Sequence, residues 1–209
     1  MITASNITYL ILSYLIGSIP FSIIAGKLLK GIDVREFGSG NAGATNTFRV
    51  LGKKAGIPVL LLDVFKGYIA VNLVWYTSYV PFSEIYINLQ LTFGIAAVLG
   101  HVFPIYVGFR GGKGVATLLG FMLALFPQAA IISIVIFILT LLFSKYVSLS
   151  SIFAGLFFPF GVYYLSHTVV PTMMIFAVFV PILLIATHQR NIERIIRGNE
   201  NKVSLKKKK

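Results

Sequence analysis

Long apolar stretches with few charges alternate with short polar segments along most of the chain. A bilayer core about 30 Å thick takes roughly 20 helical residues, and seven stretches come close to this length. They are 4–26, 56–79, 87–109, 115–126, 128–144, 149–166 and 170–187. The pattern predicts an all-α integral membrane protein with seven transmembrane helices.

The distribution of Lys and Arg predicts which side each segment faces. All of the 18 Lys and Arg except Lys66 fall in segments that an outside N-terminus would put on the inner side. Cytoplasmic loops carry an excess of these residues. We therefore expect the N-terminus outside and the C-terminus in the cytoplasm.

One region tests the helix count. A single helix over 115–144 would put the basic C-terminus outside. A break at Pro127 divides this region into two helices and so returns the C-terminus to the inner side. The resulting fourth helix has about 12 residues and spans only about 18 Å. We expect a single membrane domain over 1–197, followed by a basic cytoplasmic tail over 198–209.

Composition supports a membrane protein and excludes several kinds of site. Charged residues make up 11% of the chain, against about 25% in soluble domains. There is no Cys, so disulfides, thiolate metal sites and cysteine nucleophiles are excluded. The net charge of +12 could suggest nucleic acid, but its placement between apolar stretches indicates membrane topology instead.

A glycine-rich run precedes Arg49 in the first inner segment. Its residues are GSGNAGATN at 38–46, and small residues let several backbone N–H groups point into one concavity that suits a phosphate. The run contains a formal G-x-G-x-x-G, but a dinucleotide-binding fingerprint needs a preceding strand. A phosphate nest and a flexible linker both fit it.

A second run, FRGGKGVA at 109–116, follows the third apolar stretch. A Lys between glycines at a helix start combines a cation, N–H donors and the positive end of the helix dipole. It is not a P-loop, because Val107 stands where the first Gly is required and Gly114 replaces Ser or Thr. Three glycines around Lys113 exceed what a topological turn needs, so we favour anion binding.

A third run, HQRNI at 188–192, lies where the seventh stretch leaves the membrane. His188 and Asn191 are three residues apart and would share one helical face. A lone His at a membrane boundary is more often interfacial than functional, so this run alone indicates little. Within the second stretch, Asp63 and Lys66 are also three apart and are expected to neutralise each other.

The three runs supply cations and N–H donors but no pair of carboxylates for acid–base chemistry. The metal-binding patterns H-E-x-x-H and D-x-D are absent from the sequence, which argues against a phosphatase or kinase. No spacing ties a serine nucleophile to His101 or His188. Attack by a substrate hydroxyl on an activated acyl donor needs only positioning and charge stabilisation, and the apolar surroundings suit a lipid.

Three motifs, in this order, closely resemble the bacterial acyl-phosphate:glycerol-3-phosphate acyltransferase family. They are GSGNAGATN with Arg49, GHVFPIYVGFRGGKGVA at 100–116 and HQRNI. The resemblance implies transfer of a fatty acyl chain from acyl phosphate to the sn-1 hydroxyl of glycerol 3-phosphate, giving lysophosphatidic acid and phosphate. It also implies a bacterial cytoplasmic membrane, an active site facing the cytoplasm, no cofactor, no metal and no nucleic acid. The partner that supplies acyl phosphate would be a phosphate acyltransferase.

The resemblance implies catalytic roles for Ser39, Lys113 and His188. It assigns substrate binding to further positions of the same motifs: Asn41, Gly43, Asn46, Arg49, His101, Gly111, Gly112, Gly114, Ser151 and Asn191. Lys113 and Arg49 are expected to hold phosphates, and the glycine N–H groups to bind the acyl carbonyl or acyl phosphate. Four residues are expected to orient glycerol 3-phosphate: Asn46, Ser151, His188 and Asn191. The proton acceptor stays open, with a substrate phosphate oxygen as one candidate.

Two alternatives come from other classes. A small-anion or phosphate-ester transporter would bind its substrate near the bilayer midplane, often between inverted repeats, and the sequence has no repeat. A structural subunit would leave the glycine-rich runs unexplained. The terminal lysines, Lys206 to Lys209, are expected to attract anionic lipid by roughly 1 kcal/mol each.

Overall fold

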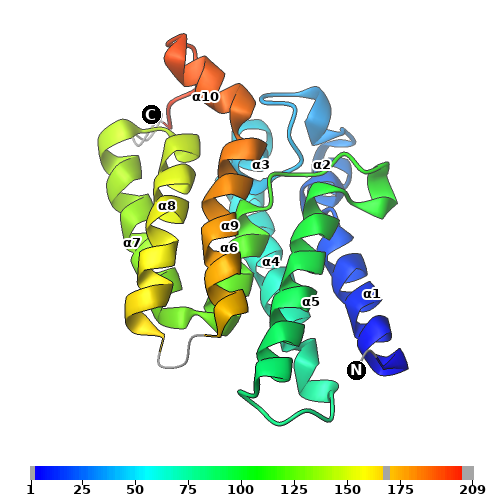
Figure 1. Cartoon of the computed structure of the whole chain (residues 1–209). Helices are drawn as coiled ribbons and strands as arrows, with labels where there is room; N and C mark the ends of the chain where they lie inside the picture. The colour runs from blue at the N-terminus through cyan, green and yellow to red at the C-terminus, as the bar shows by residue number, and fades with distance from the viewer. Residues whose placement is uncertain (1–2, 167–169, 204–209) are drawn as a thin grey trace. The chain divides into compact units, whose positions relative to one another are not determined.

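The computed structural model describes residues 3–166 and 170–203, and these form helices joined by short turns (Figure 1). The chain divides into two compact units, with the boundary between Leu125 and Phe126. Unit 1 contains α1 (Ala4–Ser18), α2 (Phe21–Lys30), α3 (Ala44–Leu51), α4 (Lys53–Asn72), α5 (Glu84–Val102) and α6 (Val115–Leu125). Short 3₁₀ turns lie at Val34–Glu36, Leu73–Tyr76 and Ile105–Val107. Unit 2 contains α7 (Pro127–Ser144), α8 (Val147–Leu165), α9 (Pro171–Thr187) and α10 (Gln189–Ile196).

Each of the seven apolar stretches contains a helix. Among the described residues, five segments are long and apolar enough to cross a bilayer by themselves: Ala4–Lys30, Lys53–Tyr76, Glu84–Val107, Pro127–Ser144 and Val147–Leu165. The pair α9 and α10, bent by 62°, would make a sixth, and α6 has only 11 residues. The expected break at Pro127 is confirmed, because α7 begins there. The count of seven spans and the outside N-terminus stay predictions.

The first apolar stretch does not form one continuous helix. Helix α1 ends at Ser18 and α2 begins at Phe21, with Pro20 between them. Proline has no N–H to donate and its ring clashes with the preceding turn, so a helix breaks there. At the break the carbonyl of Ile19 accepts from the backbone N–H of Phe21 at 3.2 Å and from Lys66 Nζ of α4 at 2.9 Å.

Glycines let the helices of unit 1 approach each other closely. On α6, a Cβ at Gly120 would collide with the carbonyl oxygen of Val64, and one at Gly67 on α4 would collide with that of Thr117. Gly17 on α1 lies in the same way against Ala97 on α5. Small residues at helix contacts are the usual way to pack helices in a membrane, where lipid is as apolar as the side chains.

Unit 2 has its own core. The rings of Phe126 and Phe158 meet edge to face at 5.4 Å between centroids, and Phe126 stacks on Phe176 at 6.1 Å. These residues come from the start of α7 and from α8 and α9, so one aromatic cluster ties the three helices together.

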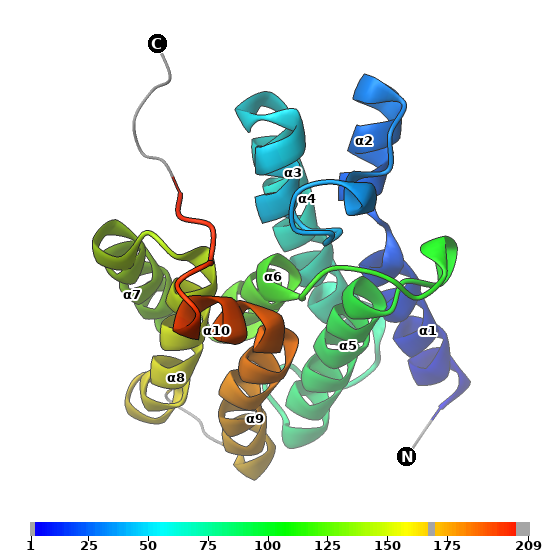
Figure 2. The ribbon, with the colours of Figure 1, turned by 90° about the horizontal axis from the view of Figure 1, so that it is seen from above.

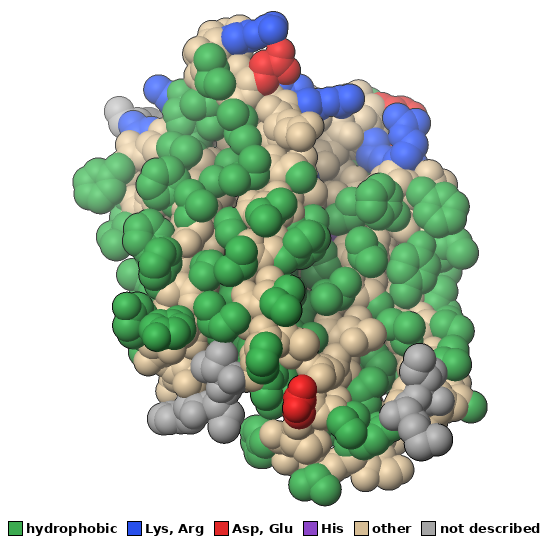
Figure 3. Space-filling view, in the orientation of Figure 1, with side chains coloured by type: hydrophobic (Ala, Val, Ile, Leu, Met, Phe, Trp, Pro, Cys, Tyr) green, Lys and Arg blue, Asp and Glu red, His purple; other side chains and the backbone are tan. Residues whose placement is uncertain are grey.

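Hydrophobic side chains dominate the outward faces of the helices (Figure 3). Phe65 on α4, Leu139 on α7 and Phe160 on α8 are each at least half exposed. Lys27 and Lys30 lie in the last turn of α2, and Arg49 lies in the last turn of α3. Apolar outer faces over whole helices suit a lipid environment rather than water.

We predict that Gly120→Ala destabilises the protein. The added methyl group meets the backbone of α4, which cannot move aside as a side chain can, so the free energy of unfolding should fall by about 1–3 kcal/mol. Thermal unfolding in detergent measures the change. Gly155→Ala on α8 is the control, because its Cβ would first meet the flexible end of Leu184. Equal losses in the two variants would contradict the close packing of α4 and α6.

Candidate active site

The segment between α2 and α3 is held together by one buried amide. Asn46 Oδ1 accepts hydrogen bonds from the backbone N–H of Ser39 at 2.8 Å and from its hydroxyl at 3.1 Å. Asn46 Nδ2 donates to the carbonyls of Val34 (2.7 Å) and Phe37 (3.1 Å). Gly38 has φ +64°, a left-handed conformation that favours glycine, and a Cβ there would collide with Asn46 Oδ1. Asn46 therefore shapes the loop: its amide oxygen holds Ser39, and its NH₂ group holds the backbone of Val34 and Phe37.

The same loop ends at the N-terminus of α3, which no side chain caps. Gly43 occupies the N-cap position, and the side-chain oxygen of Asn41 lies beside it. Arg49 is exposed in the last turn of α3. A helix N-terminus without a cap offers backbone N–H groups and a positive dipole end to an anion.

The second glycine-rich run folds back on the end of α5. Gly111 N–H donates to the carbonyl of Val102 at 3.2 Å, and Gly112 N–H donates to that of His101 at 3.1 Å. These bonds satisfy carbonyls that the end of a helix leaves without partners. Lys113, half-buried, follows directly, and Gly114 (φ +81°) turns the chain into α6.

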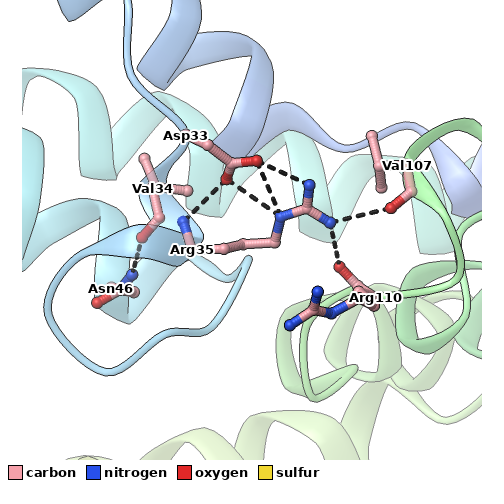
Figure 4. A network of polar contacts seen from close by, with 6 residues as sticks. All are labelled: Asp33, Val34, Arg35, Asn46, Val107 and Arg110. Carbon is pink, nitrogen blue, oxygen red and sulfur yellow. Dashed lines mark hydrogen bonds and ion pairs between the residues drawn. The ribbon is translucent and has the colours of Figure 1, made fainter.

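Arg35 joins the two runs (Figure 4). Its guanidinium Nη1 donates to the carbonyl of Val107 at 2.9 Å and to that of Arg110 at 3.1 Å. Nη2 forms an ion pair of 2.7 Å with Asp33 Oδ2, which keeps the guanidinium plane in place. Because of this clamp the α2–α3 segment lies beside the stretch that leads into α6 (Figure 2). The Ser39 loop and the Lys113 loop therefore belong to one region of unit 1.

The clamp is charged at neutral pH. The hydrogen bond from Arg35 lowers the pKa of the Asp33 carboxyl below its ordinary value of 3.8, and the same bond raises the pKa of Arg35. A carboxyl with a lowered pKa in the folded state stabilises the fold at any pH above its ordinary value. That contribution is lost as the pH falls through the lowered pKa.

In unit 2, the orientation of His188 defines which ring nitrogen carries the proton. His188 is buried between α9 and α10, and its Nδ1 lies 2.8 Å from the carbonyl oxygen of Leu184. A carbonyl only accepts, so Nδ1 is the donor. In the neutral ring, Nε2 then carries the lone pair.

A buried carboxylate holds Asn191 near the start of α8. Glu200 Oε1 accepts from Asn191 Nδ2 at 2.7 Å and from the Ser148 hydroxyl at 3.1 Å. Ser151 is buried on α8 and donates to the carbonyl of Val147 at 2.9 Å, within its own helix. The segment after α10 thus returns to α8 and fixes Asn191 of the HQRNI run.

No group of three or more His, Asp or Glu within the described ranges, 3–166 and 170–203, is arranged to hold a metal ion. The carboxylates of Asp33 and Glu200 are bound by protein groups, and the polar groups of the three motifs themselves are amides, hydroxyls, imidazoles and cations. Such groups bind and orient anions and acyl carbonyls by charge and hydrogen bonding.

The family model for glycerol-3-phosphate acyltransferase matches residues 7–198. The chain belongs to this family. Glycerol-3-phosphate acyltransferases from Chlorobium phaeovibrioides (strain DSM 265 / 1930) and Chlorobaculum tepidum are each 43% identical to it. The aligned regions cover 95% of this chain and 96% and 97% of the two relatives.

Two solved structures share the fold. Both are crystal structures of PlsY (YgiH), an integral membrane glycerol 3-phosphate acyltransferase, one in the glycerol 3-phosphate form and one in the lysophosphatidic acid form. The TM-scores are 0.85 and 0.83 and the identities 38% and 37%, with 96% of each chain covered. The chain is therefore an integral membrane acyltransferase of phospholipid synthesis. These relatives do not support the transporter alternative.

The structure joins two of the three motifs that the sequence singled out. The clamp of Arg35 brings the Ser39 loop and the Lys113 loop together within unit 1, whereas Ser151, His188 and Asn191 belong to unit 2. The amides of Gly111 and Gly112, expected to bind the acyl group, cap α5 instead, because its last carbonyls need partners. The terminal lysines 206–209 lie outside the described residues.

Two residues were missed by the sequence reasoning. No motif of the sequence assigns a role to Arg35 or to Glu200, whereas the structure gives each of them several partners. The signal for Arg35 was its spacing of two from Asp33, directly before the glycine-rich run. The signal for Glu200 was a single acid among basic residues. Neither signal reveals its partners, because those are backbone carbonyls and side chains remote in sequence.

We predict that Arg35→Lys impairs catalysis while the protein still inserts and folds. Lysine keeps the charge but cannot donate to two carbonyls and a carboxylate with one planar group, so kcat/KM should fall about 10- to 100-fold. Steady-state kinetics in detergent measures it. Lys30→Met is the control, because Lys30 is exposed and donates to a single carbonyl, that of Val50. Wild-type kinetics in Arg35→Lys would contradict the clamp.

We also predict that Glu200→Ala weakens the use of glycerol 3-phosphate. Asn191 and Ser148 would lose a charged acceptor worth about 1.5–3 kcal/mol per bond, so kcat/KM for glycerol 3-phosphate should fall at least about 10-fold. Glu193→Ala is the matched control, because Glu193 is exposed and pairs only with Arg197 on the surface of α10. Equal kinetics of the two variants would show that Glu200 does not contribute to the use of glycerol 3-phosphate.

Proposed function

We propose that the protein transfers a fatty acyl group from acyl phosphate to the sn-1 hydroxyl of glycerol 3-phosphate, on the cytoplasmic side of a bacterial inner membrane. The products are lysophosphatidic acid and inorganic phosphate. The hydroxyl oxygen attacks the acyl carbonyl carbon, the bond from that carbon to the phosphate oxygen breaks, and the hydroxyl proton passes to a phosphate oxygen. No further reactant is needed.

The observation that carries this proposal is the clamp of Arg35. It joins the loops that bear Ser39 and Lys113, each of which leads into a helix N-terminus, and Arg49 lies in the last turn of α3, the helix that follows the first loop. Cations and helix N-termini stabilise the charge that moves onto a departing phosphate. Lys113 and Arg49 would therefore hold the phosphates, with Asn41, Gly43 and Gly114 shaping the backbone around them.

The relatives support glycerol 3-phosphate as the acceptor, because one solved PlsY structure is in its glycerol 3-phosphate form. In this proposal, His188 orients the glycerol hydroxyl through Nε2, since Nδ1 faces the Leu184 carbonyl. Asn191 and Ser151 orient the same substrate. The resemblance to the acyl-phosphate enzymes supplies the donor.

An acyl-serine intermediate fits the geometry less well than direct attack. A serine nucleophile needs a base within hydrogen-bond reach. The hydroxyl of Ser39 donates to an amide oxygen, that of Asn46, and an amide is no base. The reaction therefore asks the protein to position two substrates rather than to form a covalent bond with one of them.

We predict that purified protein in detergent releases phosphate from palmitoyl phosphate only when glycerol 3-phosphate is present, and that palmitoyl-CoA gives no product. Lys113→Ala should lower turnover at least about 100-fold by removing a cation at the developing charge, while Lys54→Ala, at an exposed position of α4, should not. Chromatography of lysophosphatidic acid and a phosphate assay measure both. Turnover with palmitoyl-CoA, or full activity of Lys113→Ala, would overturn the proposal.

A further inference from the structure

Three ionisable side chains lie buried together inside unit 1. Asp63 Oδ1 on α4 forms an ion pair with Lys66 Nζ at 2.8 Å and lies 3.5 Å from His101 Nδ1 on α5. The exposed fractions of the three residues are 1%, 3% and 6%. Charged residues within membrane helices are costly and usually functional. Mutual neutralisation of Asp63 and Lys66 therefore does not by itself explain why the cluster is present.

Lys66 connects the pair to the break in the first apolar stretch. Its Nζ donates to the carbonyl of Ile19 at 2.9 Å and lies 5.6 Å from the centre of the Phe21 ring. The ammonium group thus has fixed partners on three sides, and the carboxylate of Asp63 is held in place by it.

The carboxylate lies beside the imidazole of His101, at 3.5 Å from Nδ1. Because a carboxylate can only accept, Nδ1 is the ring nitrogen that turns its N–H toward Asp63, and Nε2 lies on the opposite edge of the ring. Nε2 faces Gly112, where a Cβ would collide with it. Gly112 N–H also donates to the carbonyl of His101 at 3.1 Å. One residue therefore holds Gly112 twice, through its ring and through its backbone.

We infer that Asp63, Lys66 and His101 are positioning residues that set the loop bearing Lys113 for acyl transfer. The ion pair fixes the ring of His101, the ring and carbonyl of His101 fix Gly112, and Lys113 is the next residue. The catalytic part of this inference rests on the proposed function, whereas the ordering of the loop does not. His101 acts through Gly112 in this arrangement rather than by contact with a substrate.

The test compares two double variants in which Lys66→Met is combined with Asp63→Asn or with Asp63→Leu. Both remove the two charges together, so neither leaves an unpaired buried charge, and both lose the bond to Ile19. Asn and Leu have nearly the same shape, so the two variants differ in the polar amide of Asn, whose oxygen can accept from His101 Nδ1 and which Leu lacks.

We expect kcat of the Asp63→Leu double variant to fall about 100-fold below that of the Asp63→Asn double variant, as a small misplacement of a catalytic cation can do. KM for glycerol 3-phosphate should change much less. Hydrogen exchange of peptides covering 103–116 should be faster in the Asp63→Leu double variant, because Gly112 loses the fixed imidazole against which it lies and the bonds of Gly111 and Gly112 to α5 open more often. Val71→Ala, a buried cavity variant on α4, is the stability control and should leave kcat and loop exchange unchanged.

Equal kcat and equal loop exchange in the two double variants would overturn the inference. The same holds if Val71→Ala lowers kcat and speeds loop exchange as much as the Asp63→Leu double variant does, since the effect would then be general destabilisation. A wild-type protein that is inactive with palmitoyl phosphate would overturn the proposed function instead. The exchange measurement needs no substrate and still decides whether the cluster orders the loop.

Discussion

A broken helix in a lipid environment must find partners for its backbone carbonyls, and this requirement organises unit 1. Where α1 stops before Pro20, the carbonyl of Ile19 accepts from Lys66. Where α5 stops, its last carbonyls accept from Gly111 and Gly112. Buried backbone carbonyls need partners inside the protein, and here side chains and loops supply them. Each bond ties a polar loop to a helix end.

Hydrogen bonds to specific side chains also explain why the loops near Ser39 and Lys113 have defined positions although they contain little regular secondary structure. Asn46 uses every hydrogen-bonding group of its side chain on the loop that contains Ser39. The guanidinium of Arg35 binds Asp33 and the carbonyls of Val107 and Arg110, which precede Gly111 and Gly112. Rigid placement of this kind is what a reaction needs when the substrates themselves carry the chemical activation.

Charges in this protein work mainly by holding neighbours. Lys66, Asp63 and Arg35 bind other protein groups, and Glu200 binds Asn191 and Ser148. Cations such as Arg49 are a different class, because they are exposed and solvent screens them. Buried charges in this protein thus bind and orient other protein groups, whereas exposed cations are available to a ligand.

The sequence by itself determined the helical membrane class, the break at Pro127, the pairing of Asp63 with Lys66 and the three motifs, because apolar length, proline and i, i+3 spacing act locally. It also identified the family through those motifs. The break at Pro20 could have been foreseen from proline, but a membrane bundle tolerates such residues inside a helix, so the pattern was ambiguous. Only the tertiary structure decided that Arg35 joins the first two motifs, that Asn46 serves its own loop, and that Glu200 holds Asn191. Those contacts join backbone carbonyls and side chains that are far apart along the chain. Every residue has the same backbone carbonyl, so the sequence does not indicate which carbonyl a side chain will bind.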